Sequence, residues 1–211
     1  KLDEHGSWLL ESEQLRAECY EQRQELGRAV EVWYKIARHN RFYPRAYLRI
    51  AQIHRELDQP EYSLPAYEKA VRVAIDPRQT DRVSFEAARY AIALGRYDQA
   101  VRLAAHARLT PGRYFVEALA YFRKGELTTA RSKLETAGEL ASTPPRRYKM
   151  NTGYYMLLAQ VYYGLGLHKE TIETLENAIK LNPDSAEVAN FLGYYLADRN
   201  EQVPRARELI L

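Results

Sequence analysis

Residues 155–166 read YMLLAQVYYGLG, and residues 171–183 read TIETLENAIKLNP. The first run carries an aromatic residue, a Leu-Ala pair and a tyrosine ahead of Gly166. Glycine suits a tight turn at this point because it adopts a left-handed conformation at little cost. The second run carries an apolar residue and a small residue, and it ends at Pro183, which cannot continue a helix. These residues therefore predict two helices joined by a glycine turn.

The same pattern recurs along the chain at intervals of 34, 37, 30, 41 and 34 residues. In the first helix of each pair, the matching position holds a small residue six times: Ala17, Ala51, Ala88, Ala118, Ala159 and Gly193. In the second helix, two matching positions hold Ala29, Ser63, Ala100, Ala130, Thr171 and Ala206, and then Ile36, Ala70, Ala107, Ala137 and Ala178. Bulky residues fall between them at Trp33, Tyr67, Leu134 and Leu175. Because small side chains let helix backbones approach closely, this recurrence predicts a stack of similar helix pairs.

The pattern resembles the tetratricopeptide repeat (TPR), which has small residues, a tyrosine, a turn residue and a proline in the same order. The resemblance implies an all-α fold, an α-solenoid of stacked antiparallel helix pairs in a right-handed superhelix. It divides the chain into a lead-in (1–9), four repeats (10–43, 44–77, 81–110 and 111–144), a linker (145–151) and two further repeats (152–185 and 186–211), of which the last is truncated.

Pro65 conflicts with a helix in the second half of repeat 44–77 unless it lies in the first helical turn. If Ser63 is the N-cap, the missing N–H of Pro65 costs little. We therefore expect this helix to begin late.

The sequence contains no recognisable catalytic or metal-binding motif. Its five histidines form no HExxH or Cys/His cluster, and its single cysteine, Cys19, rules out an internal disulfide. His54 falls where the repeat carries a packed tyrosine, so we expect a buried, hydrogen-bonded ring rather than a metal ligand. We predict a non-enzymatic protein without a cofactor or a bound metal.

The resemblance implies that a protein or peptide partner binds in a concave groove lined by the first helix of each repeat. The groove positions mix arginine with aromatic and apolar residues, which is the composition of binding hot spots. The candidate residues are Arg45, Arg55, Arg82, Phe85, Arg89, Phe115, Phe122, Arg123, Met156, Tyr163, Asn190 and Tyr194, and the same positions also include Gln160, Glu187 and Ala197. We expect a partner segment with acidic and apolar residues in the middle of the groove. The alternative is that Phe115 and Phe122 only pack against neighbouring helices.

Two other functions stay open at this point. The balance of 31 basic against 28 acidic residues gives a net charge of +3, which argues against a nucleic-acid partner. An RNA-binding helical repeat is nevertheless one alternative, with phosphates held by Arg45, Arg55, Arg82 and Arg89. A self-assembling scaffold, and so a homo-oligomer, is the other, because the sequence ends on an uncapped apolar helical pattern.

Residues 189–200, ANFLGYYLADRN, resemble a variant repeat common in bacterial TPR proteins, many of which are envelope adaptors or lipoproteins. The resemblance implies an adaptor in a bacterial envelope, secretion or assembly complex. It favours the periplasm or a lipoprotein anchored to the outer membrane, with the cytoplasm as the alternative. No run of about 18 apolar residues occurs, so we expect no transmembrane helix. The lack of an initiator methionine and of a signal peptide predicts a fragment of a longer chain.

Overall fold

The structure is a computed structural model that describes residues 4–143 and 149–210, and this part of the chain forms twelve α-helices and no strand. The chain divides into two compact units, Lys1–Arg108 and Leu109–Leu211. Unit 1 contains α1 (Glu4–Gln22), α2 (Leu26–His39), α3 (Pro44–Glu56), α4 (Pro60–Val73), α5 (Pro77–Ala93) and α6 (Tyr97–Ala104). Unit 2 contains α7 (Pro111–Lys124), α8 (Leu127–Ser142), α9 (Thr152–Gly164), α10 (His168–Leu181), α11 (Ala186–Asp198) and α12 (Val203–Ile210).

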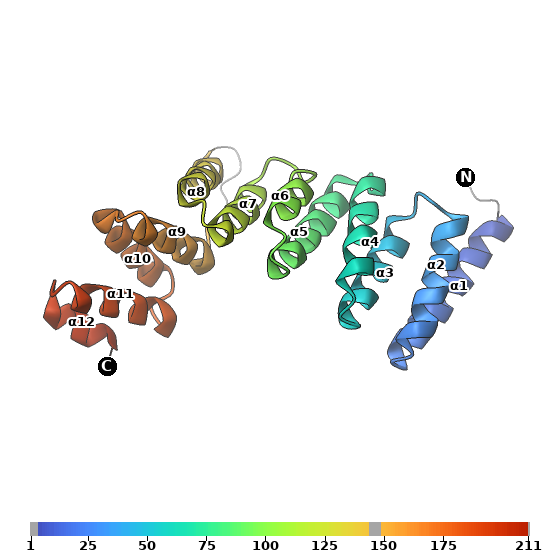
Figure 1. The fold of residues 1–211 in the computed structure, drawn as a ribbon, viewed down its shortest axis with the longest axis horizontal. Coiled ribbons are helices and arrows are strands. Elements are labelled where there is room, and N and C mark those ends of the chain that lie inside the picture. The colour runs from blue at the N-terminus through green and yellow to red at the C-terminus, as the bar shows by residue number, and fades with distance from the viewer. Residues whose placement is uncertain (1–3, 144–148, 211) are drawn as a thin grey trace. The chain divides into compact units, whose positions relative to one another are not determined.

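In both units the helices form consecutive pairs, each made of two helices joined by a short turn (Figure 1). Each odd-numbered helix packs on the even-numbered helix that follows it. In unit 1 the pairs are stacked through α2 on α3 and α4 on α5, and in unit 2 through α8 on α9 and α10 on α11. The predicted all-α architecture of stacked helix pairs is therefore confirmed within each unit.

The small residues of the predicted repeat lie where the helices cross. Those in the first helix of each pair are all buried, from Ala17 in α1 to Gly193 in α11. The bulky residues Trp33, Tyr67, Leu134 and Leu175 are also buried completely. At Gly193 the reason for a small residue is visible: a Cβ atom would lie 2.6 Å from Cγ1 of Ile210 and 3.1 Å from the carbonyl oxygen of Ala206. The small residues of the repeat pattern therefore lie at close helix crossings.

The turns inside the pairs each contain at least one left-handed residue, and the turn from α11 to α12 contains two, Asn200 and Gln202. Gly95, Gly125 and Gly166 take φ values of 71°, 88° and 71°, and the turn at Gly166 was predicted from the sequence. The other three turns use residues with side chains in the same region, namely Gln24, Asp58 and Asn200, with φ values of 59°, 54° and 54°. Asparagine and aspartate tolerate this conformation better than most residues. The turn geometry is therefore kept even where glycine is absent.

Several helices begin at a proline, which suits the first helical position because its missing N–H would be unpaired there. Pro77 and Pro111 are the first residues of α5 and α7. Asp76 and Thr110 cap these two helices, since their side-chain oxygens accept hydrogen bonds from the backbone N–H groups of Gln79 and Arg113.

The expectation of a late start for the helix containing Pro65 is wrong. α4 begins at Pro60 and carries Pro65 inside it. Ser63 does not cap the helix, because it is buried and its hydroxyl donates a 2.7 Å hydrogen bond to the carbonyl oxygen of Ala51 on α3. The helix starts early because Pro60 already supplies a favourable first position.

His54 confirms the prediction of a buried, hydrogen-bonded ring. It is buried on α3, its Nδ1 lies 2.8 Å from Oε1 of Gln59, and its Nε2 lies 3.0 Å from the hydroxyl of Tyr34. The ring also stacks on Tyr62 with centroids 5.1 Å apart.

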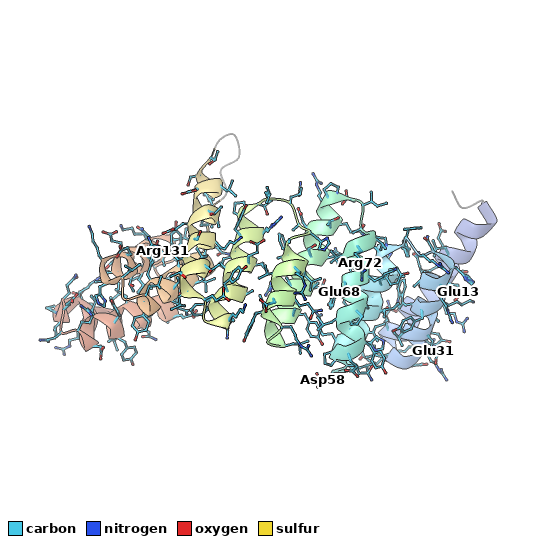
Figure 2. All side chains as sticks on the ribbon, turned by 45° about the horizontal axis from the view of Figure 1, so that its top comes forward. Glu13, Glu31, Asp58, Glu68, Arg72 and Arg131 are labelled. Atoms are coloured by element: carbon cyan, nitrogen blue, oxygen red, sulfur yellow. The ribbon has the colours of Figure 1, made fainter. Side chains whose placement is uncertain are left out.

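Charged side chains pair along the exposed helix faces, as Glu68 and Arg72 do one turn apart on α4 (Figure 2). Glu117 is different because it is almost fully buried on α7. Its carboxylate accepts a 2.8 Å hydrogen bond from Nε of Arg113 and lies 2.7 Å from Nζ of Lys133 on α8. Burying a carboxylate requires such partners, so this group ties α7 to α8.

Residues 144–148, which include Pro144 and most of the predicted linker, lie outside the described part of the chain. The grouping of the repeats into the ranges 10–144 and 152–211 therefore stays a prediction. The helix α1 starts at Glu4, ahead of the predicted first repeat at residue 10.

Candidate functional site

Unit 1 contains a polar groove of about 530 Å³ lined by α1, α3 and α5. These are the first helices of three consecutive pairs, which the repeat places on one side of the stack. The lining residues are Glu18, Glu21, Gln22, Arg45, Leu48, Arg49, Gln52, Gln79 and Arg82. They recur three and four residues apart, so each helix turns one stripe toward the groove.

A hydrogen-bond network crosses this groove from helix to helix. Glu21 on α1 accepts a 2.6 Å hydrogen bond from the indole N–H of Trp33 and forms an ion pair with Arg49 on α3. Arg49 donates to Gln52, and Gln52 donates a 2.8 Å hydrogen bond to Glu86 on α5. The charges of the wall are therefore largely neutralised by one another.

Two of the four candidate arginines in unit 1 belong to this internal pairing. Arg45 pairs with Glu18. Arg55 donates to Glu86 at 3.3 Å and to the Tyr67 hydroxyl at 3.1 Å. Burial raises the pKa of Tyr67, and the hydrogen bond that its hydroxyl donates to Glu86 raises it further. A ligand of Arg45 or Arg55 would have to compete with these partners.

The other candidates in unit 1 lie on α5. Arg82 and Arg89 are exposed, and neither forms an ion pair or a hydrogen bond with any residue that the structure describes. They are seven residues apart, about two helical turns, so both lie on one face of α5. Phe85 between them is half-buried. This face offers two unpaired cations.

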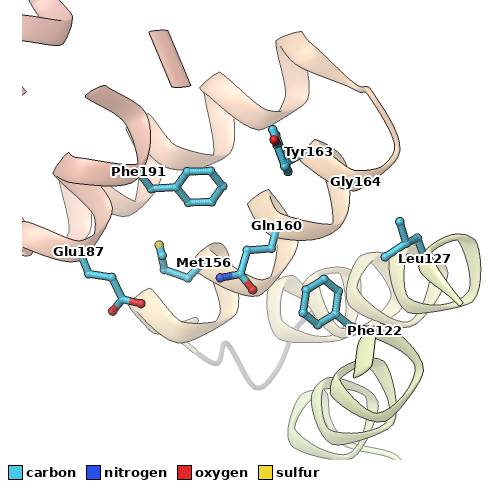
Figure 3. A pocket seen from close by; sticks show the side chains of 8 residues that line it. All are labelled: Phe122, Leu127, Met156, Gln160, Tyr163, Gly164, Glu187 and Phe191. Atoms are coloured by element: carbon cyan, nitrogen blue, oxygen red, sulfur yellow. The ribbon is translucent and has the colours of Figure 1, made fainter. Parts of the chain in front are cut away.

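Unit 2 contains an apolar groove made of two adjoining basins that share Tyr163 and Phe191. The first basin, of about 570 Å³, is lined by Phe122, Leu127, Met156, Gln160, Tyr163, Gly164, Glu187 and Phe191. The second, of about 450 Å³, is lined by Tyr163, Phe191, Tyr194, Tyr195, Ala197 and Asp198. Figure 3 shows the ring of Phe191 projecting into the first basin, with Phe122 on its opposite side. We call these two basins together the aromatic groove.

Aromatic rings meet edge to face where the basins join. The ring of Tyr163 lies 6.1 Å from that of Phe191 and 5.7 Å from that of Tyr195, both in T-shaped contacts. Tyr163 and Tyr194 are nevertheless 58% and 63% exposed. The ring of Tyr195 is buried beneath them. Its hydroxyl lies 2.6 Å from Nδ1 of His168, and this hydrogen bond fixes the position of the Tyr195 ring. The groove therefore has a fixed floor and exposed aromatic edges.

The candidate residues of unit 2 take three different positions. Phe122, Met156, Tyr163 and Tyr194 line the aromatic groove, as do Gln160, Glu187 and Ala197 from the same repeat positions. Met156, however, is only 8% exposed and belongs to the core between α9, α10 and α11, so most of its surface already packs inside the unit.

Phe115 and Phe122 both pack against the core of α7, α8 and α9, as the alternative interpretation of these residues predicted. Phe115 does not line either basin, whereas Phe122 does. Arg123 and Asn190 are exposed and lie outside both linings. The candidate residues in the middle of the sequence divide between the units, with Arg82, Phe85 and Arg89 in unit 1 and the two phenylalanines in unit 2.

Leu127, Phe191, Tyr195 and Asp198 line the aromatic groove and were not predicted. Three of them, Phe191, Tyr195 and Asp198, lie on α11 at intervals of four and three residues, on the stripe that begins at Glu187. That spacing was visible in the sequence as a run of aromatic residues at helical intervals. Leu127 could not be found this way, because it is the first residue of α8, and only the packing of the pairs brings it to the basin.

Among the described residues, no group of three or more His, Cys, Asp or Glu side chains could hold a metal ion. No described helix combines the length and the apolar character needed to cross a bilayer. Cys19 is an exposed thiol.

Two segments match the family model of the tetratricopeptide repeat, residues 44–74 in unit 1 and residues 152–185 in unit 2. These segments coincide with the pairs α3–α4 and α9–α10. No curated protein sequence matches the chain.

Solved structures similar to this chain are TPR proteins of low sequence identity. MamA (residues 41 to the end) from Desulfovibrio magneticus RS-1 is 14% identical, with a TM-score of 0.63 over 83% of this chain and 96% of that one. PilW, a widely conserved type IV pilus biogenesis factor, is 13% identical, with a TM-score of 0.65 over 95% and 90%. YrrB, a TPR protein with an unusual peptide-binding site, is 15% identical, with a TM-score of 0.59 over 85% and 89%. At such identities the likeness concerns the fold alone. Together with the two matched segments and the buried small residues of every pair, it shows that the chain has the fold of tetratricopeptide-repeat proteins.

Proposed function

We propose that this chain is a non-enzymatic protein-interaction scaffold whose aromatic groove binds a peptide or a helix of a partner protein. The observation that carries the proposal is the exposure of Tyr163 and Tyr194, 58% and 63%, beside the ring of Phe191. Exposed aromatic surface of this kind is costly in water and typical of binding hot spots. Tyrosine is suited to such contacts because its ring buries apolar area while its hydroxyl stays hydrated.

The dimensions of the groove suit a chain segment. Its two basins, of about 570 and 450 Å³, are continuous through Tyr163 and Phe191 and open to solvent. A small molecule would fill one basin, whereas a peptide or a helix could place successive apolar side chains in both. The peptide-binding site named for YrrB supports this choice, because that protein has the same fold.

We extend the proposal to a bacterial envelope, secretion or assembly complex. The resemblance of residues 189–200 to a bacterial repeat variant supports this extension, and so does the likeness in fold to a pilus biogenesis factor. Fractionation of cells that produce the full-length protein tests it. Recovery in the envelope fraction is the expected result, and recovery in the cytosol alone would contradict it.

Arg82 and Arg89 on α5 are proposed as a separate contact site within unit 1, because they are exposed cations without an ion pair or hydrogen bond among the described residues. An RNA-binding function is less well supported, because Arg45 and Arg55 are engaged by Glu18 and Glu86. Phosphate binding at these two positions would have to break ion pairs that the protein already has.

Selection from a random peptide library displayed on phage tests the scaffold proposal. The protein is expected to enrich peptides whose affinity falls about 30-fold in Tyr163→Ala or Tyr194→Ala, the effect of losing a hot-spot aromatic worth about 2 kcal/mol. Phe42→Ala is the matched control, since Phe42 is an aromatic residue of unit 1 that is 76% exposed and lines neither groove. Failure to enrich any peptide, or equal loss in the control, would refute the proposal.

A further inference from the structure

We infer that the partner segment in the aromatic groove carries lysine or arginine residues beside its apolar side chains. The inference rests on the proposed function of this groove and goes further by naming the chemistry of the partner. It differs from the sequence-based expectation of a segment with acidic and apolar residues, which concerned the arginines in the middle of the predicted groove.

The charged residues that line the aromatic groove are all acidic. Glu187 lies at the edge of the first basin (Figure 3) and Asp198 in the second, and neither lining includes a lysine or an arginine. Both carboxylates are exposed, and within the described part of the chain neither forms an ion pair or a hydrogen bond. By contrast, Glu117, Glu135 and Glu201 of the same unit all have cationic partners. The groove therefore presents two unneutralised negative charges.

Helix geometry places these two charges on one stripe. Glu187 and Asp198 both belong to α11 and are eleven residues apart. At 3.6 residues per turn, eleven residues make just over three full turns, so the two side chains leave the helix in nearly the same direction about 16 Å apart. Phe191 and Tyr194 lie between them on that face. An extended peptide covers the same distance in about five residues.

The arginines at adjoining sequence positions lie outside both linings. Arg199 follows Asp198, but its guanidinium pairs with Glu201 at 2.9 Å and lies over the ring of Tyr195. Arg123 follows Phe122 and is exposed outside the lining. The exposed faces of Tyr163 and Tyr194 would also attract a lysine or arginine through cation–π contacts. Carboxylates and aromatic faces thus select for the same partner side chains.

The net charge of the chain and the charge of the groove predict opposite preferences for the charge of a peptide. At +3, the protein as a whole attracts acidic peptides more than basic ones. A preference for basic peptides must therefore come from a local feature such as this groove.

Fluorescence anisotropy with three labelled synthetic peptides tests the inference. The peptides share one Leu-Phe-Leu core and carry, about five residues apart, either Lys, Gln or Glu at both flanks. At low salt the lysine peptide is expected to bind about tenfold more tightly than the glutamate peptide, and added salt should reduce the difference. Glu187→Gln combined with Asp198→Asn should remove the preference while leaving the affinity for the glutamine peptide unchanged. Asp184→Asn is the matched control, because Asp184 is an exposed, unpaired acid of unit 2 outside the groove.

The possible outcomes separate this inference from the proposed function. If all three peptides bind equally and Tyr163→Ala weakens all of them, the groove binds peptides and the charge inference alone is wrong. Tighter binding of the glutamate peptide would also overturn the inference. If no peptide binds in a manner that depends on Tyr163, the proposed function and the inference fail together.

Discussion

Replacing Gly193 with alanine tests whether the repeat positions mark true close crossings. In a helix interior, alanine is normally more stable than glycine by about 1 kcal/mol. At Gly193 the added Cβ would lie 2.6 Å from Cγ1 of Ile210 and 3.1 Å from the carbonyl oxygen of Ala206. Because the second contact is with backbone, α12 itself must move away from α11. Overpacking of this kind costs about 1–3 kcal/mol, so we expect a net destabilisation of up to about 2 kcal/mol.

Gly27 provides the matched control. It is the second residue of α2, and a Cβ atom there would meet no atom within 4 Å. Gly27→Ala should therefore keep only the gain in helix propensity and stabilise the protein by up to about 1 kcal/mol. The two variants make the same chemical change and are expected to shift stability in opposite directions.

Urea denaturation followed by far-UV circular dichroism measures both changes in the free energy of unfolding. Hydrogen exchange of the α11 and α12 amides adds local information, because repeats at the end of a stack can open separately from the rest. Gly193→Ala should accelerate exchange in these two helices. If Gly193→Ala stabilises the protein as Gly27→Ala does, the close approach of α12 to α11 is wrong.

Three further predictions concern stability. Ala118→Arg places a long cation in the fully buried core of unit 2 and should lower the free energy of unfolding by about 3 kcal/mol or more, so full stability in urea titration would contradict the repeat frame. Glu117→Ala leaves the cations of Arg113 and Lys133 without their carboxylate and should cost about 1–3 kcal/mol in the same titration, less than a fully buried pair because both cations reach solvent. Burial raises the pKa of Tyr154 to about 12, above the value of about 10 in an unfolded chain. The resulting stabilisation is present below pH 10 and is lost as the pH rises through 12, so alkaline titration of stability should be shallower in Tyr154→Phe.

Helix positions and core residues could be predicted because the repeat imposes the same limit on every pair. A crossing that excludes side chains larger than alanine leaves a small residue at that position each time, as at Ala51, Ala118 and Ala159. The turns were predicted only in part. Gln24, Asp58 and Asn200 adopt left-handed conformations, and no glycine marks these three turns in the sequence. The start of α4 was mispredicted because Ser63 has a stronger partner in Ala51 than it would have as a cap.

The candidate site was less predictable because side-chain pairing depends on distances between helices. Arg45 and Glu18 are 27 residues apart, and Arg55 and Glu86 are 31 apart. Whether such residues meet depends on the distance between successive helices and on the side-chain rotamers. Neither can be read from the repeat positions in the sequence. The frame therefore identified the stripe of each helix that lines a groove but not which of its charges remain available.

This difference is the reason why we propose the aromatic groove, rather than Arg45 and Arg55, as the binding site. In unit 1 an anionic partner of Arg45 must displace Glu18, so the new ion pair replaces an existing one and the net gain in free energy is small. In the aromatic groove a partner covers ring surface that only water contacts, and it neutralises carboxylates that have no internal partner. Forming these two contacts does not require an interaction inside the protein to be broken first. A partner therefore gains most binding free energy from side chains that are exposed and have no partner within the protein. Within unit 2, the stripe of α11 from Glu187 to Asp198 consists largely of such side chains.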